Sequence, residues 1–292
     1  MDTPKYDIRP IQRAVLDVFK VVAGICDKHR LRYYAFYGTA LGAIRHKGFI
    51  PWDDDLDIAM PREDYMQFVE IVKKELIPTY LKFVRGGEGY LSPPTFGRVY
   101  DSREGIVPEL SARCNLRMRY PPFVDIFVLD GAPVYIKGFV SWWLRRKMIR
   151  LCQFYRFPQT CPLSNVGIKR WWKRCAVQIV GFFVSLFYPK TATNEDLQYL
   201  IDRIALENAY DDSFMVVEST FFRFTTRRLI PKYVFEPARR VPFEDTEIRV
   251  PYKVEDLLMR SYGDYMKLPP ECQRIPEHAL GYQGGNPEWS FD

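Results

Sequence analysis

Four aspartates lie within five consecutive positions near the start of this 292-residue chain, at Asp53, Asp54, Asp55 and Asp57. Like charges this close repel one another, and ionising them together costs free energy unless a cation compensates. An acidic surface loop is the ordinary interpretation of such a cluster. Here, however, the apolar run Phe49-Ile50-Pro51-Trp52 precedes it, and Leu56 and Ile58 continue it. The cluster therefore lies against apolar material, which favours a cation-binding site over a solvated loop.

The end of this stretch alternates between polar and apolar residues from Asp55 to Ile58, which is the period of a half-buried β-strand. On such a strand Asp55 and Asp57 point to the same face, roughly 6–7 Å apart along the backbone. Two carboxylates on one face form a hard, oxygen-rich site that suits Mg²⁺ or Mn²⁺. The sequence therefore predicts a metal site here.

A second feature precedes the aspartates. Residues 32–37 are rich in aromatic side chains and predict a short buried strand that ends at Gly38. Thr39 is then predicted to cap the N-terminus of a helix over residues 40–45. A Gly-Thr pair alone is most often an ordinary turn. Because it stands about fifteen residues before the Asp-apolar-Asp pattern, it indicates a helix N-terminus that binds phosphate beside a bound cation.

A third acidic candidate lies in the apolar stretch 121–131, where Asp125 stands between Val124 and Ile126. A lone buried aspartate is costly unless it is paired or binds metal. The alternative is an aspartate near the start of a strand that caps neighbouring amides, and the residues alone favour that alternative. Asp130 precedes Gly131 and is predicted to be a turn residue.

The runs from Gly38 to Gly42 and from Arg45 to Asp57 resemble the LicD/fukutin family of phosphotransferases. That family is similar to the nucleotidyltransferase (polymerase-β-like) superfamily, whose signature is Gly-Ser/Thr, then Asp-x-Asp, then a later single Asp. The resemblance covers about residues 8–132 and 210–280. It implies an α+β fold, with a mixed sheet flanked by helices.

The resemblance also assigns roles to individual residues. Asp125 becomes the third metal-binding carboxylate beside Asp55 and Asp57, and all three are predicted to be catalytic. The phosphate and the donor are expected to contact a set formed by Gly38, Thr39, Arg45, Asp53 and Asp54. Within that set, Arg45 and Asp53 are expected to orient the phosphate-binding group.

Arg98 is the remaining catalytic candidate. It precedes Asp101-Ser102-Arg103, which is similar to a basic strand and Asp-Ser-Arg turn in the family. A guanidinium that faces the phosphates would neutralise oxyanion charge during transfer. The alternative is an ordinary surface residue on a strand, and the sequence leaves both possibilities open.

By resemblance, the enzyme moves a phospho-alcohol, above all phosphocholine, from a CDP-linked donor such as CDP-choline. The acceptor is a hydroxyl of a cell-surface glycan of the lipopolysaccharide, teichoic acid or capsule type, built on a lipid carrier. One alternative is a nucleotidyltransferase that acts on a small alcohol phosphate or nucleic acid. The other is a non-catalytic, membrane-associated glycan-binding protein. The sign of such a protein would be the loss of one of the metal-binding carboxylates. All three candidate carboxylates are present here.

Charge is distributed unevenly. Residues 131–190 hold eleven Lys and Arg and no Asp or Glu, so the formal charge of +6 comes entirely from this span. Helices are predicted over residues 135–157 and 167–188, and residues 176–188 carry no charge. Such a helix suits the surface of an anionic membrane better than nucleic acid, so no nucleic-acid partner is expected. A helical subdomain with core aromatics explains the pattern equally well.

The remaining patterns set the organisation of the chain. Helices are predicted over residues 8–29, 61–77 and 193–208, and strands over 80–84, 95–100 and 214–217. We expect a catalytic core over 1–133, a basic aromatic insertion over 134–190, and the rest of the catalytic domain over 191–292. Glu218 is a candidate for the acceptor site.

The cysteines and the chain start bear on location. Six dispersed cysteines without a Cys-x-x-Cys pattern indicate reduced thiols and no zinc site. The polar N-terminus lacks the pattern of a signal peptide, and no stretch reaches the roughly 18–20 apolar residues of a spanning helix. These features predict a cytoplasmic protein, peripheral at the inner face of the membrane if the basic helices bind lipid.

Overall fold

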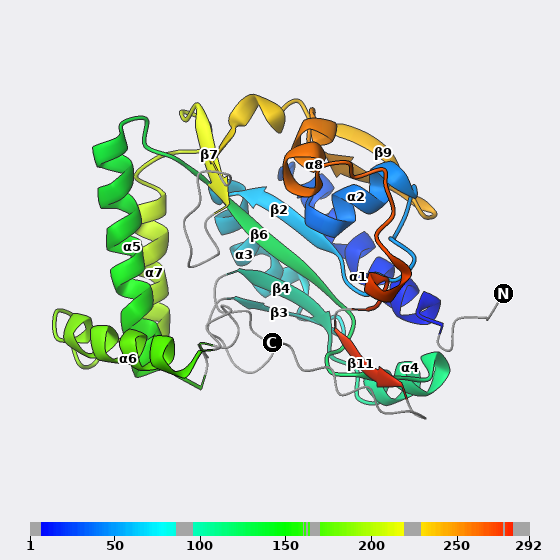
Figure 1. Cartoon of the computed structure of the whole chain (residues 1–292), viewed down its shortest axis with the longest axis horizontal. Helices are drawn as coiled ribbons and strands as arrows, with labels where there is room; N and C mark the ends of the chain where they lie inside the picture. Colours follow the sequence, from blue (N-terminus) through cyan, green and yellow to red (C-terminus); the bar gives the residue numbers. More distant parts are fainter. Residues whose placement is uncertain are drawn as a thin grey trace.

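The computed structural model describes residues 7–85, 96–159, 161, 163, 170–218, 229–276 and 278–282. A seven-stranded sheet lies at the centre of the described residues (Figure 1). Its strands are β1 (Tyr34–Ala35), β2 (Asp57–Pro61), β3 (Leu81–Arg85), β4 (Gly97–Asp101), β6 (Phe123–Gly131), β7 (Met215–Glu218) and β8 (Leu229–Pro231).

The long strand β6 organises this sheet. It runs parallel to β2 and antiparallel to both β4 and β7, so the sheet is mixed. All nine residues of β6 are buried. A continuous Val, Ile, Leu and Phe pattern is typical of a strand covered on both faces. The predicted α+β class with a mixed sheet is therefore confirmed.

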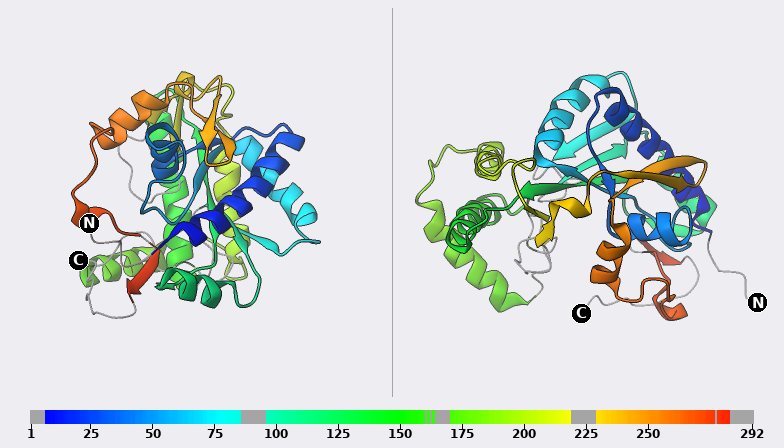
Figure 2. Two further views of the ribbon diagram at one scale, coloured as in Figure 1. Left: turned by 90° about the vertical axis from the view of Figure 1, so that its right-hand side faces the viewer. Right: turned by 90° about the horizontal axis from the view of Figure 1, so that it is seen from above.

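Helices cover both faces of the sheet. The view from above in Figure 2 shows α1 (Arg9–Lys28) and α3 (Arg62–Glu75) on one side, and α2 (Tyr37–Arg45) and α8 (Val254–Tyr262) on the other. The predicted first helix buries a stripe of apolar residues at helical spacing against the sheet, at Ile11, Val15, Phe19 and Val22. Each such side chain contributes roughly 1.5–3 kcal/mol to the stability of the fold when fully buried.

Smaller elements complete this part of the molecule. They are α4 (Ile106–Cys114), β5 (Leu116–Met118), the 3₁₀ helices η3 (Lys232–Val234) and η4 (Glu271–Gln273), β9 (Arg239–Phe243), β10 (Thr246–Val250) and β11 (Ala279–Tyr282). β9 and β10 form a hairpin, and β11 pairs with β5. Helix α4 was not predicted. It begins after Gly105, whose φ of +85° lies in the left-handed region that glycine adopts without strain.

Three helices stand to one side of the sheet, as Figures 1 and 2 show: α5 (Ile136–Arg156), α6 (Trp171–Ser185) and α7 (Asn194–Ala205). Thr193 and Asp196 form a reciprocal capping box at the start of α7, which explains why that helix was predicted correctly. The expected start of the second basic helix, at residue 167, lies outside the described residues. No helix among the described ranges is long and apolar enough to cross a membrane.

Buried ion pairs tie these helices to the sheet. Asp130 accepts hydrogen bonds from Arg62 at 2.6 and 3.2 Å, and Arg146 of α5 lies 2.8 Å from the same carboxylate. Arg62 also donates to Asp202 of α7 at 2.9 Å, and Arg85 of β3 pairs with Asp202 as well. The prediction of Asp130 as a turn residue was wrong, because it lies inside β6 and is fully buried.

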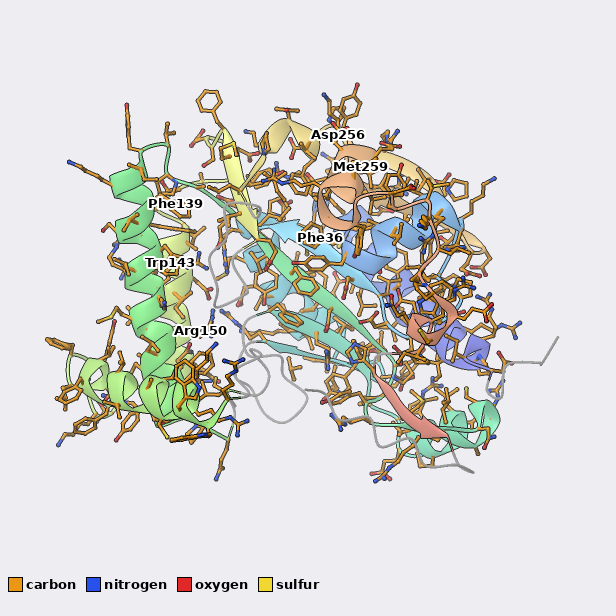
Figure 3. All side chains as sticks on the ribbon, viewed as in Figure 1. Phe36, Phe139, Trp143, Arg150, Asp256 and Met259 are labelled. Carbon is orange, nitrogen blue, oxygen red and sulfur yellow. The ribbon has the colours of Figure 1, made fainter. Side chains whose placement is uncertain are left out.

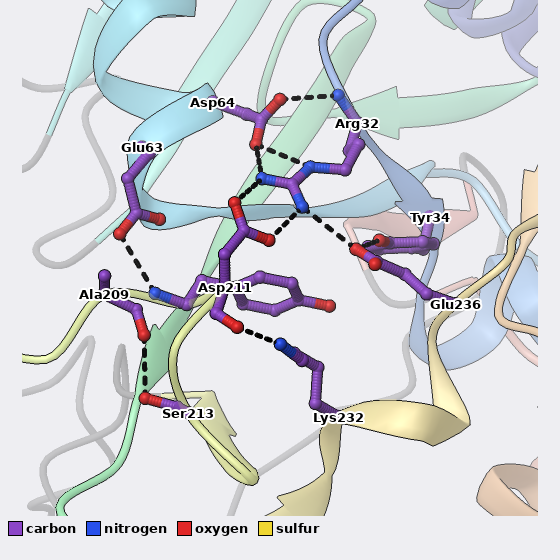
Figure 4. Close-up of polar contacts among 10 residues, drawn as sticks. Arg32, Tyr34, Glu63, Asp64, Ala209, Asp211, Ser213, Lys232 and Glu236 are labelled. Carbon is purple, nitrogen blue, oxygen red and sulfur yellow. Dashed lines mark hydrogen bonds and ion pairs between the residues drawn. The ribbon is translucent and has the colours of Figure 1, made fainter.

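A second ionic network holds the loop before β1 in place, and Figure 4 shows it in close-up. Arg32 donates to both oxygens of Asp211 and to Asp64, with its backbone amide also bonded to Asp64 at 2.8 Å. Glu236 accepts from Arg32 at 3.1 Å and from the hydroxyl of Tyr34 at 2.9 Å. Segments more than 150 residues apart in the chain are joined at this arginine.

Two local predictions around the aspartates were wrong. The first strand is only Tyr34–Ala35, and α2 already begins at Tyr37 with Phe36 at its N-cap, so Thr39 does not cap the helix. Strand β2 begins at Asp57, so Asp55 precedes the strand. In both places the chain bends tightly to bring α2 against β2, and propensity alone does not encode that packing.

Candidate active site

Strand pairing aligns three of the predicted site residues across the sheet. Asp57 on β2 lies directly opposite Asp125 on β6, and Arg98 on β4 lies directly opposite Asp125 on its other side. Directly opposite residues share a face of a sheet and have neighbouring Cβ atoms. Residues far apart in the chain therefore meet in one row, with a carboxylate in the centre.

Arg98 is held by Asp125. Its Nε and Nη2 donate to the two carboxylate oxygens at 2.6 and 2.8 Å, the bidentate geometry of the strongest charge-assisted pairs. The guanidinium also lies 3.7 Å from the centre of the Phe123 ring. Burial acts to lower the pKa of Arg98, but the charge of Asp125 outweighs it and the pKa lies above its usual value. Arg98 thus lies behind Asp125, with both groups buried.

His278 provides a contact that the sequence gave no reason to expect. Its Nε2 lies 2.9 Å from Oδ2 of Asp55, and its backbone amide donates to Asp54 at 3.1 Å. Burial acts to lower the pKa of His278, but the hydrogen bond and charge of Asp55 raise it to about 9. Burial acts to raise the pKa of Asp55, but the hydrogen bond from His278 outweighs it and the pKa falls below its usual value. The two groups form a charged pair.

Thr39 and Gly38 lie in the first turn of α2. The Thr39 hydroxyl oxygen accepts the backbone N–H of Asp57 at 2.8 Å, so it fixes the start of the strand that carries Asp57. A Cβ at Gly38 would stand 2.8 Å from Oδ2 of Asp53, which leaves room only for glycine at that approach. The helix N-terminus and the aspartate cluster are therefore in direct contact.

These residues line one large cavity of about 930 Å³. Gly38, Arg45, Asp53, Asp55, Asp57 and Asp125 all contribute to its wall, together with His278. The opposite wall comes from the segment after α8, including Tyr265, whose backbone oxygen accepts from Arg45 at 2.7 Å. The cavity thus brings together most of the predicted site. Thr39, Asp54 and Arg98 lie behind its surface, each at most 8% exposed.

The charge of the cavity bears on what it can bind. Five carboxylates line it, against the three basic side chains Arg45, Lys267 and His278. This excess of negative charge opposes a phosphate ligand unless a cation enters with it. The donor set of hard carboxylate oxygens fits Mg²⁺ or Mn²⁺. In the arrangement described, however, Arg98 and His278 hold oxygens of Asp125 and Asp55, and no group of three possible ligands is preassembled among the described residues.

A mixed sheet, a cavity of about 930 Å³ with carboxylates from neighbouring strands in its wall, and a helix N-terminus beside them are the features of a phosphotransferase with a nucleotidyltransferase-like fold. Residues 30–89 match the family model described as the LicD/FKTN/FKRP nucleotidyltransferase domain. Over these residues the chain is similar to the LicD/fukutin family of phosphotransferases.

Two curated relatives extend this result. The chain is 28% identical over 283 residues to the lipopolysaccharide cholinephosphotransferase LicD of Haemophilus influenzae. This alignment covers 94% of this chain and 97% of that protein. It is 38% identical over 52 residues to the human ribitol 5-phosphate transferase FKRP, or 18% of this chain and 10% of that protein. The first similarity extends through the basic insertion, whereas the second is confined to a short segment.

Proposed function

We propose that this enzyme transfers a phospho-alcohol group, with phosphocholine as the first candidate, from a CDP-linked donor to a hydroxyl of a cell-surface glycan. The observation that carries the proposal is the cavity lined by Asp55, Asp57 and Asp125 beside the N-terminus of α2. The similarity along nearly the whole chain to a lipopolysaccharide cholinephosphotransferase supports both the head group and a glycan acceptor of the lipopolysaccharide type. Teichoic acid and capsule acceptors present the same chemical group.

The transfer is a substitution at phosphorus. The oxygen of the acceptor hydroxyl forms a bond to the phosphorus of the phospho-alcohol, and the bond from that phosphorus to the CMP oxygen breaks. CMP leaves with the electron pair, and the hydroxyl proton passes to a carboxylate in the cavity wall. Gly38 allows the backbone of α2 to approach the phosphate, and Arg45 supplies positive charge nearby.

A divalent cation, Mg²⁺ or Mn²⁺, is part of the proposal. Asp55, Asp57 and Asp125 would hold it, with Asp53 and Asp54 beside them. Bound there, the ion would neutralise the charge of the donor diphosphate and of the leaving oxygen. The excess of carboxylates over basic side chains in the cavity supports this requirement. Arg98 holds the carboxylate of Asp125 in position, although burial still raises the pKa of Asp125, and His278 holds the carboxylate of Asp55.

The decisive experiment is transfer and hydrolysis with a panel of CDP-choline, CDP-ethanolamine, CDP-glycerol and CDP-ribitol, with Mg²⁺ or EDTA. We expect metal-dependent CMP release that falls at least about a hundredfold in Asp57→Asn, a loss of a transition-state interaction worth about 3 kcal/mol. Asp256→Asn is the matched control, because Asp256 lies exposed on α8, as labelled in Figure 3. Pyrophosphate release from CTP, with no CMP release from any donor, would contradict the proposal and indicate a nucleotidyltransferase.

We further propose that α6 rests on an anionic membrane at the cytoplasmic face, near a lipid-linked acceptor. One side of α6 packs closely on α5, because a Cβ at Gly181 would stand 2.7 Å from the backbone oxygen of Leu151. The other side exposes a row of apolar residues at helical spacing, at Trp172, Ala176, Ile179, Val180 and Phe183, continued by Phe187. Basic residues at Arg170, Lys173, Arg174 and Lys190 flank the row. This combination suits an interfacial helix.

Flotation with liposomes that contain anionic lipid tests this contact. Ile179→Ser/Phe183→Ser removes apolar exposure without touching the packed side, and we expect recovery with the liposomes to fall at least about fivefold, since each lost side chain weakens interfacial binding. Tyr199→Ser, at an exposed position on α7, is the control. Equal recovery of all three proteins would rule out α6 as the contact.

A further inference from the structure

A buried glutamine outside the cavity holds the turn that leads into the aspartate cluster. Gln12 lies early in α1 and is only 1% exposed, and a polar side chain is rarely buried without partners. Its Nε2 donates to two backbone oxygens, that of Asp53 at 2.8 Å and that of Ile50 at 3.1 Å. Both N–H groups of the amide are therefore used, and both bind a segment far along the chain.

The two acceptors are the ends of a single β-turn. The amide of Asp53 donates to the backbone oxygen of Ile50 at 2.9 Å, so these four residues close a turn. Pro51 occupies its second position, where the fixed φ of proline is favoured. Gln12 thus bonds the first and the last carbonyl of the turn. Trp52 and Asp53 line the large cavity, and the chain continues from here into the rest of the aspartate cluster.

Arg9 fixes which way the amide of Gln12 points. Nη1 of Arg9 donates to Oε1 of Gln12 at 2.6 Å, which leaves the amide nitrogen to face the turn. A guanidinium has donors only, so the reversed amide would set donor against donor. Arg9 is held in turn by Glu244, which lies between β9 and β10 and accepts from Nη2 at 2.6 Å. The contacts therefore run from the hairpin through α1 to the turn.

Glu244 holds the same loop a few residues earlier. Its Oε1 accepts the backbone N–H of Phe49 at 3.0 Å, and its own backbone amide donates to the oxygen of Lys47 at 2.9 Å. The loop between α2 and β2 is therefore held from two sides, by α1 and by the hairpin. The side chains of Gln12 and Glu244 make these contacts without lining the large cavity.

We propose that Gln12 is a positioning residue for the transfer reaction. Its two hydrogen bonds set the orientation of the turn, and with it the place of Asp53 and of the carboxylates that follow. A neutral amide suits this task, because it binds two carbonyls without adding a charge that would shift the pKa values of the aspartates. This inference rests on the proposed function for the reaction that the turn serves.

Gln12→Met tests the proposal. Methionine keeps the length of the side chain but donates no hydrogen bond. The backbone oxygen of Ile50 still accepts from Asp53, and Arg9 still pairs with Glu244, so we expect a folded protein that melts about 2–6 °C lower. We expect kcat for CMP release to fall at least about tenfold, because displaced groups catalyse poorly. The donor KM should change less than about threefold, since the loss falls on the transition state.

Ile11→Val is the matched control. Ile11 is the preceding residue on the same helix, is 1% exposed and packs in the core. Removing one buried methyl group should lower the melting temperature by a similar amount. We expect kcat to stay within about twofold of wild type, because no hydrogen bond to the turn is lost. Equal values of kcat in Gln12→Met and Ile11→Val would show that Gln12 acts only through stability, and would overturn the proposal.

Hydrogen exchange measured by mass spectrometry examines the turn without any donor. We expect peptides that cover residues 48–57 to exchange at least about fivefold faster in Gln12→Met, and at the wild-type rate in Ile11→Val. Unchanged exchange in Gln12→Met would overturn the hold of Gln12 on the turn.

These outcomes are distinguishable from failure of the proposed function. If CMP release is metal-dependent but Gln12→Met matches the control, the transferase stands and the positioning role is wrong. If no CDP-alcohol reacts, the donor assignment fails, and Mn²⁺ affinity then tests the position of the carboxylates. Binding at least about fivefold weaker in Gln12→Met than in Ile11→Val would support the role of Gln12, since metal affinity depends on ligand placement. Equal affinities would overturn it.

Discussion

Both oxygens of the Asp125 carboxylate accept hydrogen bonds from the guanidinium of Arg98, directly across the pairing of β6 with β4. The pair is buried, so neither charge is compensated by water. Asp125 in turn lies opposite Asp57 on β2. The position and charge of the central carboxylate therefore depend on a residue that does not itself line the cavity.

Arg98→Ala should cost stability as well as activity. Removing one partner of a buried ion pair leaves an uncompensated charge, which typically costs about 3–5 kcal/mol. We expect the free energy of unfolding, measured in urea by circular dichroism, to fall by that amount. Arg113→Ala, which removes an exposed ion pair with Glu109 on α4, should cost at most about 0.5 kcal/mol. A loss below 1 kcal/mol for Arg98→Ala would contradict the role of the pair, since breaking a buried pair costs about 3 kcal/mol or more.

Thr39→Val tests the hydrogen bond of the Thr39 hydroxyl separately from the volume of the side chain. Valine keeps the volume but removes the oxygen that accepts the Asp57 amide, so a buried donor is left without its partner at a cost of about 1–3 kcal/mol. We also expect kcat for CDP-alcohol turnover to fall, because Asp57 loses its anchor. Thr39→Ser retains the acceptor and should restore most of both quantities. Identical behaviour of the two variants would show that this hydrogen bond is irrelevant.

Two helical glycines should respond to alanine with opposite signs. A Cβ at Gly42 in α2 would lie 2.5 Å from the backbone oxygen of Gly48, so Gly42→Ala should destabilise the protein by at least about 1–3 kcal/mol. A Cβ at Gly24 in α1 meets no atom within 4 Å, so Gly24→Ala should stabilise it by about 0.5–1 kcal/mol. Melting temperatures measured side by side test both, and shifts of the same sign would contradict the packing described.

Glu244 should contribute to acid sensitivity. It accepts hydrogen bonds from Arg9 and from the backbone amide of Phe49, and the side-chain bond from Arg9 holds the pKa of Glu244 below its usual value despite burial. A carboxylate with a depressed folded-state pKa stabilises the protein above its unfolded pKa. That stabilisation is lost as the pH falls through the folded pKa.

The comparison with Glu244→Gln measures this contribution. The difference in unfolding free energy between wild type and variant should be largest near neutral pH and should shrink between about pH 5 and about pH 3, where unfolded and folded carboxylates take up protons. Denaturant unfolding at a series of pH values provides the measurement. A difference that grows toward acid would mean that the sign of the pKa shift is wrong.

Local patterns in the sequence predicted much of this fold, and the failures share one physical cause. Helices α1 and α7 are encoded within a few turns, by an apolar stripe and by a capping box, and both helices were predicted correctly. The partners of Asp125 and Asp55 are not local, because register between strands and the path of the C-terminal segment decide them. A sequence with three histidines gave no signal that His278 would reach the aspartate cluster.

The basic span of residues 131–190 also shows that local sequence does not reveal non-local partners. Arg146 and Arg150 belong to the acid-free segment and were counted toward a basic surface, yet Arg150 is buried and the side chain of Arg146 is only 10% exposed. Arg146 lies beside Asp130, and Arg150 donates to Gln153 and Gln198. Counting charges along the chain could not show which of them face solvent, since their acidic and polar partners come from β6 and α7.

The pairing of His278 with Asp55 joins residues 223 positions apart. A ribosome delivers the aspartate cluster early and the histidine only after most of the polypeptide has emerged. Until then the sheet carries its acidic residues without this countercharge, and the cavity lacks one wall. The aspartate cluster and its countercharge are therefore made far apart in time as well as in sequence.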